Sequence, residues 1–145
     1  MKAKEILLVE DNSDDIELTV MALKEAKITN PVVVARNGVE ALDYLFGTGA
    51  HAGRDTAVQP VVVFLDIKLP LLNGIDVLKR MRADERTRRT PVVMLTSSTE
   101  QADIARTYDL GANSYVRKPV DFAEFSEAVR QLGVYWLGLN EPSPR

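Results

Sequence analysis

Short runs of apolar, mostly β-branched residues recur along the chain and are typical of strands. They cover residues 6–9, 32–35, 61–65, 92–95 and 114–116. Several of these runs are apolar at consecutive positions, which predicts strands buried on both faces, as in a parallel sheet covered by helices. We therefore expect a five-stranded parallel sheet.

The segments between these runs have helical apolar spacing. Ile16, Val20 and Leu23 recur in the first of them. The last repeats the pattern with Phe122, Phe125, Val129 and Leu132. Start signals for helices, a capping side chain with an acid three residues later, occur at Asn37 with Glu40 and at Asp121 with Glu124. The alternation of strand and helix predicts a doubly wound α/β domain with helices on both faces of the sheet.

The third apolar run ends on a carboxylate, Asp66. A charged group at the end of a buried strand is costly unless it is paired or binds a metal. A turn residue at the start of the next loop is the alternative interpretation. We expect a cation or a basic side chain to contact Asp66.

Polar residues follow the other strands as well. The carboxyl ends of parallel strands form the ligand crevice of such a fold. Three crowded carboxylates repel one another, and a hard divalent cation such as Mg²⁺ relieves that repulsion. The residues expected at this edge are Glu10, Asp11, Asp66, Thr96, Ser97 and Lys118. For Glu10 and Asp11 taken alone, capping of the next helix is an equal alternative.

Composition narrows the class of protein. The 145 residues are 46% hydrophobic and fit one domain. The net charge is only −3, so no strongly basic nucleic-acid surface is expected. The chain has no cysteine, which excludes disulfides and thiolate chemistry. Without a signal-peptide pattern or a membrane-length apolar segment, a cytoplasmic location is expected.

Taken together, these motifs resemble the receiver domains of two-component response regulators. The residues at positions 8–12 resemble the acidic-pair motif of that family, and 65–70 with Asn73 and Gly74 resemble its phosphoacceptor loop. Positions 95–97 resemble its switch strand end, and Lys118 with Pro119 its lysine motif. The likeness covers about residues 5 to 132 and implies the flavodoxin-like strand order 2-1-3-4-5.

The resemblance implies a role for each matched residue. Asp66 accepts a phosphoryl group from a sensor histidine kinase, and Lys118 and Thr96 contact that group. Magnesium is bound by Asp11 and Asp66, by the main-chain carbonyl of Lys68, and by Glu10 through water. The protein is then a switch that promotes its own phosphorylation and dephosphorylation, rather than a turnover enzyme.

The same family likeness implies a conformational switch formed by Thr96 and Tyr115, in which the tyrosine turns inward when the threonine moves toward the phosphoryl group. Simple packing of Tyr115 is the alternative. The expected output face comprises the fourth helix, the fifth strand and the fifth helix. By family analogy Lys68 and Ser98 influence the lifetime of the phosphoryl group.

The end of the chain departs from a minimal receiver. Tyr135 and Trp136 continue the helical spacing past Gly133, so we expect an extension over residues 133–139 of a domain spanning 1–139, followed by a disordered tail at 140–145. This end resembles single-domain regulators paired with bacterial and cyanobacterial phytochrome histidine kinases. That likeness implies a phytochrome partner and a homodimer in which Tyr135 and Trp136 lie at the interface. The alternative is that they cover their own core.

The segment 47–59 and the histidine within it indicate no specific function. The segment 47–59 contains glycines but lacks the lysine and hydroxyl residue of a phosphate-binding loop, so we interpret it as a flexible connection. His51, the only histidine, lies in this segment and is interpreted as a solvated side chain.

Two alternative functions remain open at this point. A receiver-like scaffold that works without phosphorylation normally lacks one of the acids or the lysine, and all are present here. A dehalogenase-type phosphatase needs a second aspartate two residues after the first, where this chain has Lys68. With no predicted DNA-binding helix pair after residue 139, we expect the output to pass to partner proteins and not directly to DNA.

Overall fold

The computed structural model describes residues 4–119 and 121–144 and has alternating strands and helices. The ends of the predicted ranges 1–139 and 140–145, residues 1–3 and 145, lie outside the described residues. The strands are β1 (Ile6–Val9), β2 (Val32–Ala35), β3 (Val62–Leu65), β4 (Val92–Thr96) and β5 (Ser114–Arg117). The helices are α1 (Ser13–Glu25), α2 (Gly38–Phe46), α3 (Gly74–Ala83), α4 (Gln101–Asp109) and α5 (Phe122–Val134).

All five strands are parallel and lie in the order β2-β1-β3-β4-β5. This order confirms the prediction of a doubly wound, flavodoxin-like sheet. The predicted strand bounds were wrong by one residue at three places: β3 begins at Val62, β4 extends to Thr96 and β5 extends to Arg117. Each difference lies where an apolar run meets a polar residue or a proline, because ladder pairing rather than side-chain polarity decides where a strand ends.

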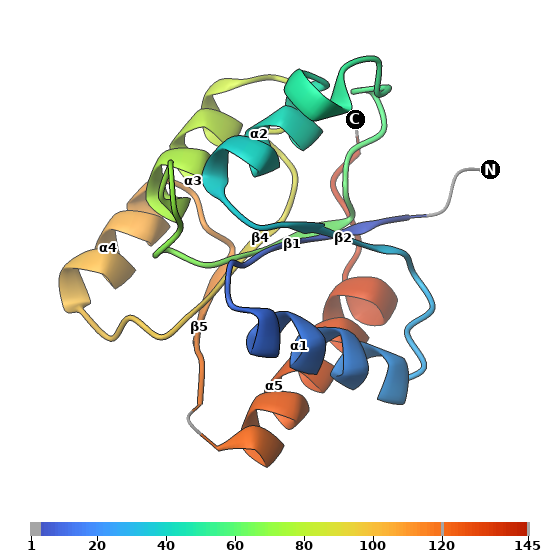
Figure 1. The fold of residues 1–145 in the computed structure, drawn as a ribbon, viewed down its shortest axis with the longest axis vertical. Coiled ribbons are helices and arrows are strands. Elements are labelled where there is room, and N and C mark those ends of the chain that lie inside the picture. The colour runs from blue at the N-terminus through green and yellow to red at the C-terminus, as the bar shows by residue number, and fades with distance from the viewer. Residues whose placement is uncertain (1–3, 120, 145) are drawn as a thin grey trace.

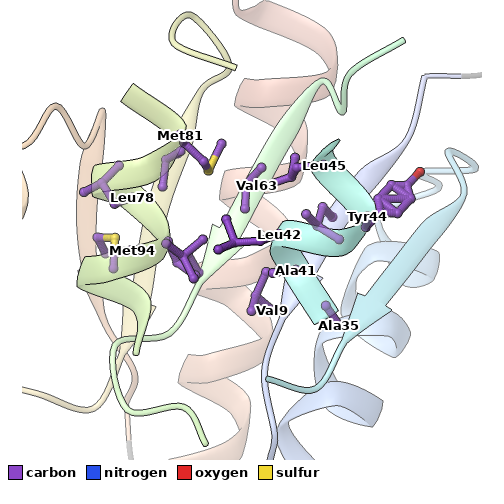
Figure 2. Packing of buried hydrophobic residues seen from close by; sticks show 14 of the residues in the cluster. Val9, Ala35, Ala41, Leu42, Tyr44, Leu45, Val63, Leu78, Met81 and Met94 are labelled. Carbon is purple, nitrogen blue, oxygen red and sulfur yellow. The ribbon is translucent and has the colours of Figure 1, made fainter. Parts of the chain in front are cut away.

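Helices cover both faces of the sheet (Figure 1). On one face lie α1 and α5, which contact each other, and on the other lie α2, α3 and α4. Because side chains alternate along each strand, β1 sends Leu7 and Val9 to one core cluster and Ile6 and Leu8 to the other. Figure 2 shows the cluster under α2 and α3, where Leu42 and Leu45 meet Val63.

Side-chain caps fix where four helices begin. Asn12, Asn37, Asn73 and Asp121 each accept a hydrogen bond from the backbone N–H three residues later. Such a cap satisfies an orphan amide of the first turn and is worth about 1 kcal/mol. Asn12 and Asn73 directly follow loops that carry the predicted site residues, so these caps also fix the course of those loops.

The segment 47–59 is folded, and its interpretation as a flexible connection is corrected by the structure. It contains a short 3₁₀ helix, η1 (Gly49–His51). Arg54 donates hydrogen bonds to the carbonyls of Tyr44, Leu45 and Val58, and its guanidinium lies 4.2 Å from the centre of the Tyr44 ring. The segment is therefore bound to the carboxyl end of α2. His51 packs edge-on against the same ring, with centroids 5.1 Å apart.

The last helix continues past Gly133, as the spacing of the aromatic residues predicted. It ends at Val134 and passes into a π-helix, η2 (Tyr135–Leu139). A Cβ at Gly133 would lie 2.9 Å from Cδ2 of Leu23, so the glycine permits close packing of α5 on α1. Over the described part of the chain, no helix combines the length and the apolar character needed to cross a membrane.

Candidate phosphoacceptor and metal site

The predicted site residues meet at the carboxyl edge of the sheet. Two backbone hydrogen bonds hold the strand ends in register there: Asp66 N–H donates to the Val9 carbonyl at 3.1 Å, and Lys118 N–H donates to the Thr96 carbonyl at 2.7 Å. Because neighbouring strands end at the same level, the side chains that follow them lie close together. Glu10, Asp66 and Thr96 are buried, whereas Asp11 is exposed at the rim.

Lys118 is the centre of this arrangement. Its ammonium contacts three carboxylates: Oε1 of Glu10, Oδ2 of Asp66 at 3.0 Å, and Oδ2 of Asp15 at 3.0 Å. The side chains of Lys118, Glu10 and Asp66 are at most 8% exposed, whereas that of Asp15 is 29% exposed. A lysine this deeply buried needs such partners.

The environment shifts the ionisation of two of these groups. Burial raises the pKa of Glu10 to about 6, although Lys118 acts in the opposite direction. Burial by itself lowers the pKa of Lys118, but hydrogen bonds and charges from Glu10, Asp66 and Asp15 outweigh it and raise that pKa above its usual range. Lys118 is therefore charged at neutral pH and supplies a fixed positive charge beside Asp66.

The acidic residues have the chemistry of a site for a hard divalent cation. Carboxylate oxygens of Glu10, Asp11 and Asp66 all lie within 4.8 Å of one another. Oδ1 of Asp66 is buried and, among the described residues, has no hydrogen-bond partner. A buried acceptor without a donor is costly, and a cation coordinated by that oxygen removes the cost. The residues thus fit the expected magnesium. The side chain of Lys68 is exposed in the loop after Asp66. The role expected for its main-chain carbonyl as a metal ligand stays a prediction.

The loop after Asp66 is held tightly against α3. Gly74 N–H donates to the Ile67 carbonyl at 2.8 Å, and a Cβ at Gly74 would lie 2.0 Å from the Asp66 carbonyl oxygen. Only glycine allows this approach. The Asn73-Gly74 pair therefore begins α3 directly over the loop that follows Asp66 and fixes the backbone of Asp66.

The two predicted switch residues are linked through Ser98. Thr96 is fully buried, and its hydroxyl oxygen accepts a long hydrogen bond, 3.4 Å, from Ser98 N–H. Tyr115 donates its hydroxyl hydrogen to the Ser98 carbonyl at 2.8 Å. Ser98 Oγ in turn donates to Oδ2 of Asp103 at 2.6 Å. One loop, between β4 and α4, thus contacts both Thr96 and Tyr115 and the first turn of α4.

Two residues that make polar contacts in the site were missed by the sequence reasoning. Asp15 reaches Lys118 from the first turn of α1, and Arg36 at the end of β2 donates to the Asp11 carbonyl at 3.3 Å and to Ser13 Oγ at 2.7 Å. Asp15 lies three residues after the capping Asn12, where an acid is common in a first turn, but that position indicates a helix start and not a contact with Lys118. Arg36 gave no motif signal.

Tyr135 and Trp136 lie apart from these residues, near the end of the chain. Their rings meet edge to face with centroids 5.0 Å apart. Tyr135 is 47% exposed, while Trp136 is partly buried against the core cluster under α1 and α5. Together with β5 and α5 they line a groove of about 630 Å³, whose other residues are Asn113, Ser114, Val116, Ala128, Gln131, Leu132 and Asn140. Trp136 thus covers its own core, whereas Tyr135 faces outward, and its packing on a second copy stays a prediction.

Comparison with known proteins matches most of the chain to one family model. The model described as "Response regulator receiver domain" matches residues 6–130. The protein named "Probable methanogenesis regulatory protein FilR2" from Methanothrix harundinacea is 39% identical over 140 residues, which cover 96% of this chain and 88% of the relative.

Solved structures agree with the sequence comparison. The phosphorylated cyanobacterial phytochrome response regulator RcpA is 34% identical with a TM-score of 0.91, covering 99% of this chain and all of that one. The Mn²⁺-bound form of response regulator Rcp1 is 29% identical with a TM-score of 0.90, covering 97% and 99%. Rcp1 from Synechocystis is also a sequence relative, 31% identical over 92% of this chain and 89% of its own.

Proposed function

The chain belongs to the response regulator receiver domain family, and from that premise we propose that Asp66 accepts a phosphoryl group from a sensor histidine kinase. Membership confirms the resemblance inferred from the motifs, and phosphoryl acceptance is the function of this family of signalling switches. Receiver domains bind Mg²⁺ or Mn²⁺ in their acidic pocket, as the Mn²⁺-bound Rcp1 illustrates. The assignment of each role to a residue of this chain is our proposal.

The observation that carries the proposal is the environment of Asp66. One carboxylate oxygen is paired with Lys118, and the other is buried without a hydrogen-bond partner among the described residues, beside Glu10 and Asp11. An ionised carboxylate has two oxygens with about four lone pairs, so Asp66 can bind a cation and still keep a free lone pair as a nucleophile. The adjacent positive charge of Lys118 compensates the negative charge that a phosphoryl group brings.

Transfer then needs little beyond positioning and charge neutralisation. A carboxylate oxygen of Asp66 attacks phosphorus, the new O–P bond forms as the P–N bond of the phosphohistidine breaks, and the electron pair of that bond stays on the departing imidazole. Lys118 and the Thr96 hydroxyl contact the phosphoryl oxygens. Asp11, Asp66 and the main-chain carbonyl of Lys68 would hold magnesium directly and Glu10 would hold it through water, and the metal would supply further neutralisation of these oxygens.

The decisive experiment is intact-protein mass spectrometry after incubation with acetyl phosphate and magnesium. We expect a phosphate-sized mass gain in the wild type that is lost in Asp66→Asn. The isosteric amide keeps the volume of the site. A thermal unfolding curve that matches that of wild type shows that the variant is folded. Absence of the gain in folded wild type, with acetyl phosphate and with a phosphohistidine donor, contradicts the proposal.

For the upstream partner we propose a phytochrome histidine kinase, which would make the input light-dependent. The proposal rests on the likeness over the whole chain to a phytochrome response regulator. Phosphotransfer to this protein from a phytochrome kinase should differ between red and far-red illumination. Equal transfer under both, or transfer only from kinases of other sensor classes, argues against this partner.

For the conformational switch we propose that Thr96 and Tyr115 move together through the loop between β4 and α4. The hydrogen bonds of Ser98 to both residues support a coupled motion. The Tyr115 ring resonances should shift when a phosphoryl mimic is bound in wild type and not in Asp66→Asn. Unchanged resonances count against the switch.

We also propose that residues 131–139 belong to the receiver unit and form part of a homodimer interface with α4, β5 and α5. The family model ends at 130, yet Leu132, Trp136 and Leu137 pack against the same core cluster as β1 and α5. The exposed ring of Tyr135 and the groove beside it offer the surface for a second copy. We expect the protein to act in the cytoplasm on protein partners.

A further inference from the structure

Asp15 is a third carboxylate on Lys118 and comes from a different layer of the fold. It lies in the first turn of α1, where its N–H donates a hydrogen bond to the side chain of the capping Asn12. Its carbonyl accepts a hydrogen bond from the Thr19 hydroxyl at 2.7 Å. Its carboxylate does not bond back to the cap but reaches across to Lys118 Nζ at 3.0 Å. The helix that carries Asp15 is thereby connected to the strand end that carries Lys118.

The hydrogen bonds of Lys118 leave no donor for a phosphoryl group. An ammonium has three N–H bonds. Three carboxylates contact this one, namely Glu10, Asp15 and Asp66. A phosphoryl group on Asp66 that is contacted by Lys118 must therefore displace one existing contact.

Of the three contacts, the one to Asp15 is the least costly to break. Glu10 is buried to 4% side-chain exposure and also accepts hydrogen bonds from the N–H groups of Asp11 and Asn12, so releasing it leaves a buried charge. Asp66 is itself the residue that receives the phosphoryl group. The Asp15 side chain is 29% exposed, so water replaces Lys118 as its partner.

We propose that Asp15 is a positioning residue that holds the Lys118 ammonium before phosphorylation and releases it to the incoming phosphoryl group. The proposal rests on the proposed function of Asp66. An interaction present before the reaction and absent in the transition state stabilises only the ground state and slows the chemical step. Asp15 thus restrains phosphorylation and makes it depend on a contact of α1.

The test compares Asp15→Asn with Asp14→Asn in the full chain, using acetyl phosphate as the donor at fixed magnesium. Asp14 lies in the same turn and is exposed, and its change removes the same charge. Both variants weaken repulsion of the anionic donor and should lower its half-saturating concentration similarly. Only Asp15→Asn should raise the phosphorylation rate at saturating donor, by about threefold to fivefold, the range for loss of one partly exposed ion pair.

A conservative variant separates the ion pair from a loss of local structure. Asp15→Glu keeps the charge and has the reach to contact Lys118, so its saturating rate should return toward that of wild type. Thermal unfolding of all three variants checks the fold. If the rate of Asp15→Asn at saturating donor equals that of Asp14→Asn, or is lower than that of wild type, the proposed release of Lys118 by Asp15 is contradicted. The proposed phosphorylation of Asp66 is not affected by that outcome. If folded wild type is not phosphorylated at all, both proposals fail.

Discussion

At the scale of single residues, Lys118 balances the charge of two buried carboxylates. Glu10 and Asp66 both contact its ammonium, and both lie in low-dielectric surroundings where an unpaired charge is costly. Removing the cation while leaving the acids therefore has a larger effect than the loss of an ordinary lysine. The same contacts with the carboxylates raise the pKa of Lys118 above its usual range.

Lys118→Met should lower the free energy of unfolding by about 3 kcal/mol, because it leaves two buried carboxylates without their common partner. Thermal unfolding without divalent cations measures this loss. Added magnesium should then stabilise the variant more than it stabilises wild type, since the metal takes over the missing neutralisation. The control is Lys79→Met on an exposed position of α3. Equal melting temperatures for the two variants would falsify the account.

Gly74 is the second residue on which the site depends. Gly74→Ala places a Cβ where the Asp66 carbonyl oxygen now lies 2.0 Å away, so the phosphoacceptor loop must shift. We expect a loss of about 2 kcal/mol in the free energy of unfolding, within the usual range for overpacking, and slower phosphorylation of Asp66. Gly138→Ala is the control, because a Cβ at that position meets nothing within 4 Å. A Gly74→Ala protein as stable and as reactive as that control contradicts the prediction.

The predictability of the site also differs residue by residue. Asp66 and Lys118 were predictable because each directly follows a strand, and the edge of a parallel sheet brings such positions together. Asp15 was not, because its contact depends on the rotation of α1 about its axis and on the packing of α1 against the sheet. Neither is encoded in the spacing of a motif.

At the scale of elements, strands were easier to predict than the connections between them. Fully buried strands such as β1 and β3 show as continuous apolar runs, and the alternation of five short strand-like runs with helical segments was enough to infer the sheet. The segment 47–59 has no such pattern, because its structure depends on side chains such as Arg54 and Gln59, whose partners are backbone carbonyls. Backbone acceptors leave no trace in the sequence, so a folded segment was mistaken for a flexible one.

Arg54→Ala should loosen this segment without disturbing the sheet. The carbonyls of Tyr44, Leu45 and Val58 lose charged donors, and each such hydrogen bond is worth about 1.5–3 kcal/mol at most. We expect faster amide hydrogen exchange over residues 45–59 and a loss of roughly 2 kcal/mol in the free energy of unfolding.

The matched control for Arg54 is Arg130→Ala on α5. Arg130 pairs with the exposed Glu127, and an exposed pair contributes little. Its exchange pattern over 45–59 should equal that of wild type. If Arg54→Ala leaves the exchange of this segment unchanged, the hydrogen bonds of Arg54 do not hold it.

At the scale of the whole molecule, the proposed phosphorylation site and the proposed dimer surface occupy different regions. Phosphoryl chemistry is proposed at the carboxyl edge of the sheet, whereas the aromatic end of the chain extends the face of β5 and α5. Ser98 follows β4 at this edge and contacts both Thr96 and Tyr115, which lies on β5. A change at Asp66 therefore has a physical route to the face where a second copy is proposed to bind.

The proposed dimer gives the last prediction. Tyr135→Asp should convert a dimer to a monomer, because it puts a charge where an exposed aromatic ring is proposed to be buried, and interface cores are depleted of charge. Light scattering after size exclusion, at several micromolar concentrations, measures the mass. Leu71→Asp is the control: Leu71 is 78% exposed in the loop between β3 and α3, outside the proposed interface, so its mass should match wild type. A wild type that is monomeric at every concentration, or a Tyr135→Asp dimer as stable as that of the control, places the interface elsewhere or removes it.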